Sequence, residues 1–241
     1  MPDSPDFSKY LPNSKRFSLD DMGELAARLG SPVSYDRRGE VVWYDTFSGG
    51  LGGWLTDVGG AGSVVSLSAA GDYHWGYHAL LTAGAVAGSY AYLYRRAGCW
   101  ASAKFGVEFS FALSETCNSV DILIYLSTFV YVINAGVRYI PASGKWQVMT
   151  GINVWQDVVT MTLHHAGSIV YHHVKLVMDS ETGRYLRLLL DNQLVDISSL
   201  GFSWLMSSAV PQFSLQIYNY GSGAELERLR IGHVLLTDNE S

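Results

Sequence analysis

The feature that most constrains this chain is an alternation of apolar and polar residues that begins at Glu40 and continues almost to the C-terminus. The clearest stretch is 104–111, Lys-Phe-Gly-Val-Glu-Phe-Ser-Phe, in which every second residue is large and apolar. Successive side chains of a β-strand point to opposite faces of a sheet, so this spacing predicts a strand with its phenylalanines and valine in a core. The same alternation predicts that Glu108 is exposed.

Short β-branched and aromatic segments recur about every ten residues, separated by Gly-rich breaks. The pair Asp191-Asn192 predicts a tight hairpin turn between 185–190 and 193–196, and 166–168 predicts a second hairpin joining 158–164 to 169–179. Many short strands without intervening helices indicate an antiparallel β-sandwich or barrel rather than a βαβ fold. The other predicted strands are 41–47, 63–67, 77–82, 89–95, 120–126, 130–133, 137–140, 145–150, 213–220 and 226–236.

The N-terminal part of the chain has a different character. Residues 1–16 are polar and rich in proline, which predicts an extended arm. Ser18 can cap a helix, and the apolar residues that follow it fall at helical spacing, so a short amphipathic helix is predicted over 19–29. We therefore divide the chain into an arm with a short helix, 1–39, and a β-sandwich domain, 40–241.

Composition argues against several classes of partner. The net charge is −6, and no run of basic residues is longer than Arg37-Arg38 or Arg95-Arg96, so no nucleic-acid partner is predicted. No stretch approaches the roughly 18 apolar residues of a membrane span, so no membrane insertion is predicted. The polar start lacks the pattern of a secretory signal peptide. The localisation is therefore left open. The two options are a virion and the extracellular space after release from the cell. Whether Cys99 and Cys117 pair is also left open.

No catalytic motif is found. The best same-face carboxylates, Glu225 and Glu227, are interpreted as a solvated edge beside arginines. The histidines occur as the adjacent pairs 164–165 and 172–173, and adjacent side chains on a strand diverge, which argues against a metal site. We therefore predict no catalytic residue, no metal and no cofactor, and we expect that the chain is not an enzyme.

Aromatic residues are the remaining candidates for a binding site. Flat rings stack on sugar faces and anchor protein interfaces. Tyr73, Trp75 and Tyr77 lie in one predicted recognition loop, and Trp54 ends a Gly-rich loop. We predict these four as ligand-binding residues.

Several segments together resemble one superfamily. The sequences at 43–47 (Trp-Tyr-Asp-Thr-Phe), Trp54 and 76–82 (Gly-Tyr-His-Ala-Leu-Leu-Thr) resemble the opening of jelly-roll carbohydrate-binding modules. The sequences at 171–179, 182–188 and 191–195 resemble hairpins of laminin-G-like domains, and 229–236 resembles their final strand. The chain thus resembles the concanavalin A-like lectin/glucanase superfamily, which implies two antiparallel sheets in a jelly-roll sandwich.

The resemblance implies glycan binding, adhesion and assembly, or polysaccharide hydrolysis. Many of the binding modules hold a structural calcium between an early acidic residue and an aspartate on the last strand. Asp45 matches the first ligand, whereas 231–234 (Ile-Gly-His-Val) offers no acid. The closely spaced catalytic acids of the superfamily's hydrolases have no match in this sequence.

The sequence therefore predicts an all-β, two-sheet antiparallel jelly-roll sandwich with an N-terminal extended arm and one short helix. The first functional hypothesis is a non-catalytic structural protein that forms a homo-oligomer through its arm, as a coat, decoration or tail component of a phage or virus-like particle. One alternative is a carbohydrate-binding module at a cell surface with a glycan partner. The second alternative is a glycoside hydrolase with an unrecognised site.

Overall fold

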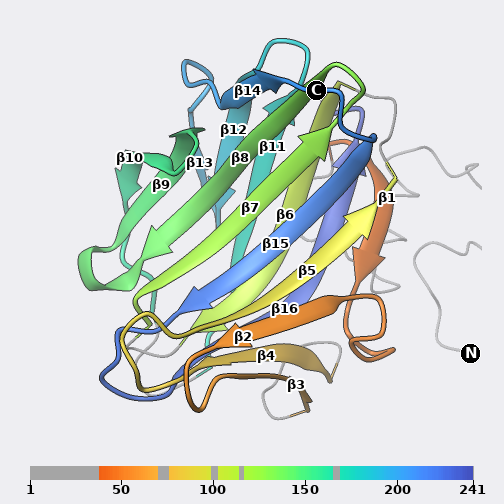
Figure 1. Cartoon of the computed structure of the whole chain (residues 1–241). Coiled ribbons are helices and arrows are strands. Elements are labelled where there is room, and N and C mark those ends of the chain that lie inside the picture. The colour runs from red at the N-terminus through yellow and green to blue at the C-terminus, as the bar shows by residue number, and fades with distance from the viewer. Residues whose placement is uncertain (1–37, 70–75, 99–102, 114–116, 165–168, 241) are drawn as a thin grey trace, which may run out of the picture. The chain divides into compact units, whose positions relative to one another are not determined.

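The computed structural model describes residues 38–69, 76–98, 103–113, 117–164 and 169–240, which form two antiparallel β-sheets packed face to face (Figure 1). The sandwich belongs to the unit Gly39–Ser241, and Met1–Arg38 forms a separate unit. The predicted arm and the helix at 19–29 lie outside the described residues. None of the helices in the described part of the chain has the length and apolar character that a membrane span requires.

The first sheet, called sheet A, has the strand order β13-β12-β11-β6-β16-β4-β3, and β1 also pairs with β16. It lies behind the other sheet in Figure 1. Its strands are β1 (Glu40–Asp45), β3 (Val64–Ser68), β4 (His78–Ala83), β6 (Lys104–Leu113), β11 (His172–Asp179), β12 (Arg184–Leu190), β13 (Gln193–Val195) and β16 (Glu227–Asp238).

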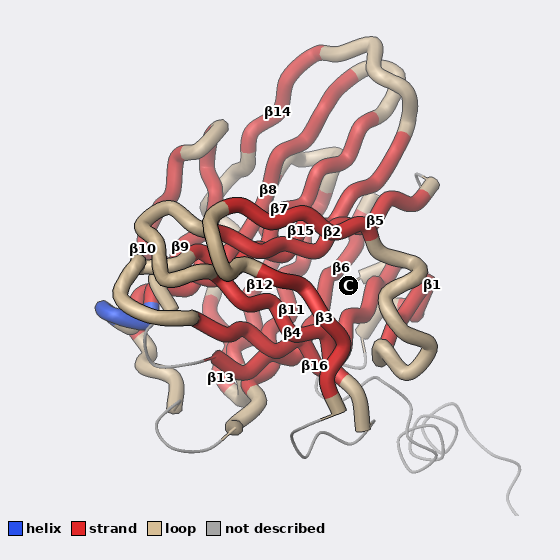
Figure 2. The backbone as a smooth tube through the Cα atoms, turned by 60° about the horizontal axis from the view of Figure 1, so that its bottom comes forward, coloured by secondary structure: helices blue, strands red, loops and turns tan. Residues whose placement is uncertain are grey.

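The second sheet, called sheet B, has the order β10-β9-β8-β7-β15-β5-β2, and β14 also pairs with β8. Figure 2 shows β7, β8 and β15 of this sheet lying over β11, β4 and β16 of sheet A. A single 3-10 turn, Pro141–Ser143, joins β8 to β9. The strands are β2 (Leu55–Gly59), β5 (Tyr90–Ala97), β7 (Ser119–Ser127), β8 (Tyr131–Ile140), β9 (Lys145–Gly151), β10 (Val154–Thr160), β14 (Ser203–Met206) and β15 (Gln212–Tyr220).

The core lies between the two sheets and follows the predicted alternation. Every second residue of β6, from Phe105 to Phe111, is fully buried and faces the inner side chains of sheet B, such as Ile217 and Val137. Tyr185 crosses this core from β12: its hydroxyl accepts the N–H of Gly136 at 3.1 Å and donates to the carbonyl oxygen of Met149 at 2.7 Å. The two sheets are therefore joined by a buried polar contact as well as by apolar packing.

The two hairpin predictions have different outcomes. Asp191 adopts a left-handed φ of 48° in the turn between β12 and β13, so the tight turn is confirmed. The hairpin expected between 158–164 and 169–179 is wrong, because β10 is an outer strand of sheet B whereas β11 belongs to sheet A. Alternation gives the direction of side chains but not the sheet to which a strand is added.

Other details of the structure differ from the predictions or add to them. The separate strands at 130–133 and 137–140 form one strand, β8, because Gly136 continues the ladder opposite Leu123. The strands β2 and β14 were not predicted. Cys117 is a buried free thiol, and Cys99 lies outside the described residues.

Candidate functional site

The outer face of sheet B carries a ladder of tyrosines. On β5 the inward positions are Ala91 and Leu93, both fully buried, so Tyr90, Tyr92 and Tyr94 all point outward. On β15 the inward Ile217 alternates in the same way with outward tyrosines. Because β5 and β15 are adjacent antiparallel strands, their outward rings lie side by side.

The rings of this ladder are in direct contact. Tyr92 stacks on Tyr218 across the two strands, with 4.5 Å between ring centroids and an interplanar angle of 23°. Tyr218 and Tyr220 are parallel within 2° at 5.4 Å. Tyr90 and Tyr94 flank Tyr92 at 6.1 and 6.3 Å. All five rings are half-buried, so each keeps part of its surface open to solvent.

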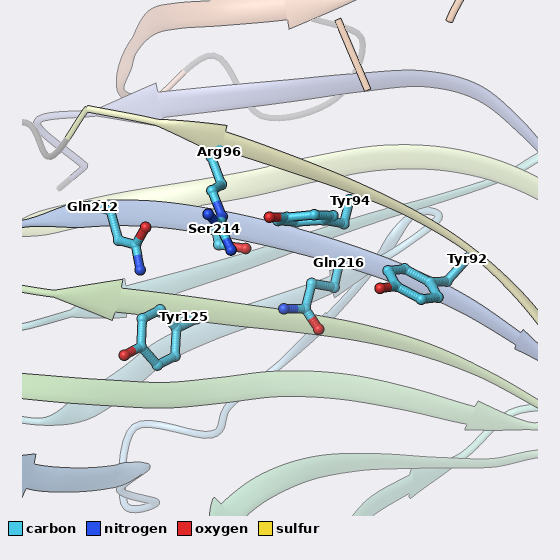
Figure 3. Close-up of a pocket in the computed structure, with 7 residues that line it drawn as sticks. All are labelled: Tyr92, Tyr94, Arg96, Tyr125, Gln212, Ser214 and Gln216. Atoms are coloured by element: carbon cyan, nitrogen blue, oxygen red, sulfur yellow. The ribbon is translucent and has the colours of Figure 1, made fainter. Parts of the chain in front are cut away.

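A depression of about 290 Å³ lies at one end of the ladder, above β5, β15 and β7 (Figure 3). Its lining combines phenol, guanidinium, amide and hydroxyl groups. A polar, aromatic hollow of this kind offers stacking surfaces together with hydrogen-bond donors and acceptors. The lining residues are Tyr92, Tyr94, Arg96, Tyr125, Gln212, Ser214 and Gln216.

Burial favours the neutral form of three ladder tyrosines, Tyr92, Tyr218 and Tyr220. It raises the pKa of Tyr92 and of Tyr218, and the neighbouring acid Asp57 and the other phenols raise them further. The pKa of Tyr220 is also raised, first by burial and then by Asp121. These phenols are therefore neutral near pH 7, and each hydroxyl can donate a hydrogen bond and accept one.

Arg96 brings positive charge to the depression. Its guanidinium lies over the ring of Tyr94, with Cζ 5.0 Å from the ring centroid, and its side chain is exposed. Among the described residues, no carboxylate forms an ion pair with it. A guanidinium held against an aromatic ring in this way can pair with a carboxylate or a hydroxyl of a ligand.

A line of polar groups continues from the ladder across the rest of sheet B. Tyr218 faces Asp121 on β7, and the same cross-strand line then runs through β8, β9 and β10. With about 4.8 Å between strands, the six strands of this line span about 24 Å. Its members from β5 to β10 are Tyr92, Tyr218, Asp121, Arg138, Gln147 and Asp157.

Ion pairs hold the side chains on β7 to β10 of this line in place. Arg138 binds the carboxylate of Asp121 through both Nε, at 2.8 Å, and Nη2, and its guanidinium lies 4.1 Å from the ring centroid of Trp155. Asp157 accepts hydrogen bonds from Gln147 at 2.6 Å and Lys145 at 2.5 Å. These side chain hydrogen bonds lower the pKa of Asp157. Trp155, on the last strand of this line, is therefore a half-exposed ring held beside the guanidinium of Arg138.

Of the four predicted ligand-binding residues, the two that the structure describes, Trp54 and Tyr77, lie outside the tyrosine ladder. Trp54 is only 6% exposed, packs against Phe47 and Trp43, and donates its indole N–H to Asp45 at 2.9 Å. Its ring therefore packs in the core rather than offering a face to a ligand. Tyr77 is exposed just before β4 of sheet A, and its ligand-binding role stays a prediction. Tyr73 and Trp75 lie outside the described residues.

Sequence reasoning missed the tyrosine ladder, although the sequence contains its signal. Residues 90–94 read Tyr-Ala-Tyr-Leu-Tyr, and 216–220 read Gln-Ile-Tyr-Asn-Tyr. Aromatic residues at every second position, alternating with residues that fill the core, predict an aromatic stripe on the outer face of a strand. The predicted binding residues instead lie in or beside loops.

The acidic residues singled out in the sequence, Glu225, Glu227 and Asp45, have different environments in the structure. Glu227 is fully buried and accepts hydrogen bonds from the N–H groups of Asn118 and Ser222, whereas Glu225 is exposed, so the solvated carboxylate pair is a wrong interpretation. Asp45 has partners within the chain: one carboxylate oxygen accepts the backbone N–H of Phe47 and the other accepts the indole N–H of Trp54.

Comparison with known proteins identifies the fold. No protein-family model matches the chain, and no curated protein has a similar sequence. Among solved structures, an endo-β-1,4-glucuronan lyase from the fungus Trichoderma reesei is similar, with 13% identity, a TM-score of 0.57, and coverage of 83% of this chain and 96% of the lyase. The carbohydrate recognition domain of Emp47p is also similar, with 12% identity, a TM-score of 0.52, and coverage of 78% and 89%. The cellulose induced protein Cip1 has 9% identity, a TM-score of 0.51, and coverage of 81% and 96%.

These likenesses confirm the superfamily resemblance at the level of the fold: the chain has the two-sheet sandwich of concanavalin A-like lectins and glucanases. They also correct one expectation. We predicted that the chain is not an enzyme. A polysaccharide lyase has the same fold, which contradicts this prediction. A lectin-like sandwich accommodates catalysis as well as binding.

Proposed function

We propose that the outer face of sheet B binds an extended polysaccharide chain, with sugar rings stacked along the tyrosine ladder. The observation that carries the proposal is the continuous contact of Tyr92, Tyr218 and Tyr220 beside a hollow lined by polar groups. Apolar sugar faces pack on such rings, and the neutral phenols and amides offer hydrogen bonds to hydroxyls. The line of about 24 Å across six strands is long enough for several sugar units.

Arg96 favours an acidic polysaccharide over a neutral one. Its guanidinium is exposed within the depression, and a uronate carboxylate would supply the bidentate partner that it can accept. The similar glucuronan lyase acts on a polymer of this chemistry, which supports the same choice. We expect binding to acidic oligosaccharides to weaken as salt concentration rises.

Isothermal titration calorimetry with glucuronan and cello-oligosaccharides tests the proposal. Truncation of one stacked ring, Tyr92→Ala or Tyr218→Ala, should weaken binding by about tenfold, equivalent to about 1.4 kcal/mol. Tyr44→Ala is the matched control, because Tyr44 is 55% exposed on β1 of sheet A. The proposal fails if no oligosaccharide binds, or if the control variant loses as much affinity as the ladder variants.

A second candidate is cleavage of a uronate polysaccharide by β-elimination. The phenol of Tyr125 and the guanidinium of Arg96 both line the depression, which supports this second candidate. The arginine would neutralise the uronate carboxylate, a base would remove the proton at C5, and the C4–O bond would break to leave a C4=C5 double bond, with a proton passing to the leaving oxygen. Ultraviolet absorbance of the unsaturated product should appear with wild-type protein and be lost in Arg96→Gln. Binding without any such product would remove this candidate and leave the first intact.

The hypothesis of a self-assembling coat or tail component depends on the N-terminal arm, which lies outside the described residues. It stays a prediction, and so does the homo-oligomer that it implies. Light scattering of the full chain and of a chain lacking 1–16 would test both.

A further inference from the structure

Two histidines and a glutamate meet on the outer face of sheet A. Glu108 lies on β6, and the neighbouring strands β11 and β16 contribute His173 and His233. One ligand atom from each of the three residues lies within 4.8 Å of the other two. The imidazole rings are 5.5 Å apart between centroids, and Nε2 of His233 lies 3.6 Å from Oε1 of Glu108.

Strand register explains this convergence. His173 and His233 both stand opposite Ser110, one on each side of β6, and Glu108 follows two residues along the same face. A β-bulge between Ile231 and His233 is essential to the arrangement. Without the extra residue, strict alternation from the core residue Ile231 would turn His233 inward. The bulge instead turns it onto the outer face.

Ser110 fixes the orientation of one imidazole. Its Oγ is 3.0 Å from Nδ1 of His233 and also accepts the backbone N–H of that residue at 3.0 Å. A hydroxyl oxygen has two lone pairs, so it can accept both the backbone N–H and an Nδ1–H. In that tautomer the lone pair of Nε2 points toward Glu108. Histidines that bind metals are commonly held by a hydrogen bond from their other ring nitrogen.

The cluster is buried, which conflicts with the predicted exposure of Glu108. Glu108 and His233 are 1% and 2% exposed, whereas His173 is half-buried and gives the cluster access to solvent. Lys175 stands opposite Glu108 in the pairing of β11 with β6, and its ammonium pairs with Glu240 at 2.6 Å. Arg187 pairs with Glu240 as well.

We propose that Glu108, His173 and His233 bind a divalent transition metal ion, with zinc as the first choice. Two imidazole nitrogens and one carboxylate oxygen are a ligand set that such ions take, and three protein ligands leave a position for water. Bond lengths of about 2.0–2.1 Å require ligand atoms about 3.3 Å apart, so the side chains must close by rotamer adjustments of about 1 Å. The ion would tie together β11, β6 and β16, on the opposite outer face from the tyrosine ladder. The site is therefore independent of the proposed glycan function.

Zinc binding by the tag-free full-length protein tests this proposal. Equilibrium dialysis against zinc, with metal analysis of the protein, should give about one zinc per chain. Zinc should also raise the melting temperature, and a chelator should reverse the rise. Cobalt substitution should give the visible absorption of a low-coordinate site with nitrogen ligands. A protein that binds no zinc under these conditions overturns the proposal.

Variants locate the bound ion. His173→Gln and Glu108→Gln keep side chain size and should each weaken zinc binding at least tenfold and abolish the zinc-induced rise in melting temperature. Ser110→Ala should weaken zinc binding by about 10- to 100-fold, because the imidazole of His233 loses the hydrogen bond that orients it. His164→Gln is the matched control, because His164 is exposed. Circular dichroism establishes that each variant is folded. If folded His173→Gln and Glu108→Gln both bind zinc as tightly as wild type, the ion lies elsewhere and the proposal is wrong.

Discussion

The ion pair between Asp121 and Arg138 on sheet B allows a quantitative test of how the candidate surface is held in place. The Asp121 side chain is 2% exposed, and Asp121→Asn keeps its shape while removing the negative charge that both Nε and Nη2 of Arg138 contact. Breaking a fully buried pair by removing one partner costs about 3–5 kcal/mol. The Arg138 side chain is 26% exposed, so water can solvate its charge, and the expected loss falls to about 2 kcal/mol.

Thermal unfolding followed by circular dichroism measures this loss. For a domain of this size about 1 kcal/mol corresponds to roughly 2–4 °C, so Asp121→Asn should lower the melting temperature by about 4–8 °C. Asp157→Asn is the control, because Asp157 and its partner Lys145 are 48% and 45% exposed, and this variant should leave the melting temperature almost unchanged. Equal effects of the two substitutions, or a change below about 1 °C for Asp121→Asn, would refute the reasoning.

Two further predictions concern the packing of the sheets. Tyr185→Phe removes the hydroxyl that bonds Gly136 and Met149 and should lower the free energy of unfolding by about 2–3 kcal/mol in urea titrations, and a loss under about 0.5 kcal/mol would contradict this. Burial lowers the pKa of His172, but hydrogen bonds to Asp191 and the His164 carbonyl outweigh it, and the net pKa is raised above 6.5. Stability from protonated His172 should be complete below pH 6.5 and lost as pH rises through the raised pKa, a dependence that His172→Gln should remove.

The sequence predicted the sandwich because the alternation is strong where one face of a strand packs in the core and the other face points outward. The stretch 104–111 illustrates this, since its apolar positions are all core residues. The order of strands in each sheet did not follow from that pattern, and β10 and β11 were wrongly paired for this reason. Pairing partners depend on contacts between distant segments, which a local period of two does not encode.

The candidate sites were harder to predict for two physical reasons. The tyrosine ladder is formed by β5 and β15, which are separated by more than a hundred residues and become neighbours only in the sheet. The cluster of Glu108, His173 and His233 needs a β-bulge, and a bulge reverses the side chain direction that alternation predicts. Its burial also contradicts the exposure expected for Glu108.

Chemical-shift mapping on the deuterated, isotope-labelled 26.5 kDa chain tests most directly whether sheet B is a glycan-binding surface. A glucuronan oligomer should shift amide resonances along β5, β15 and β7, with the largest changes around Tyr92, Tyr218 and Arg96. Shifts confined to sheet A, or no shifts at oligomer concentrations that saturate other glycan-binding proteins, would contradict the account.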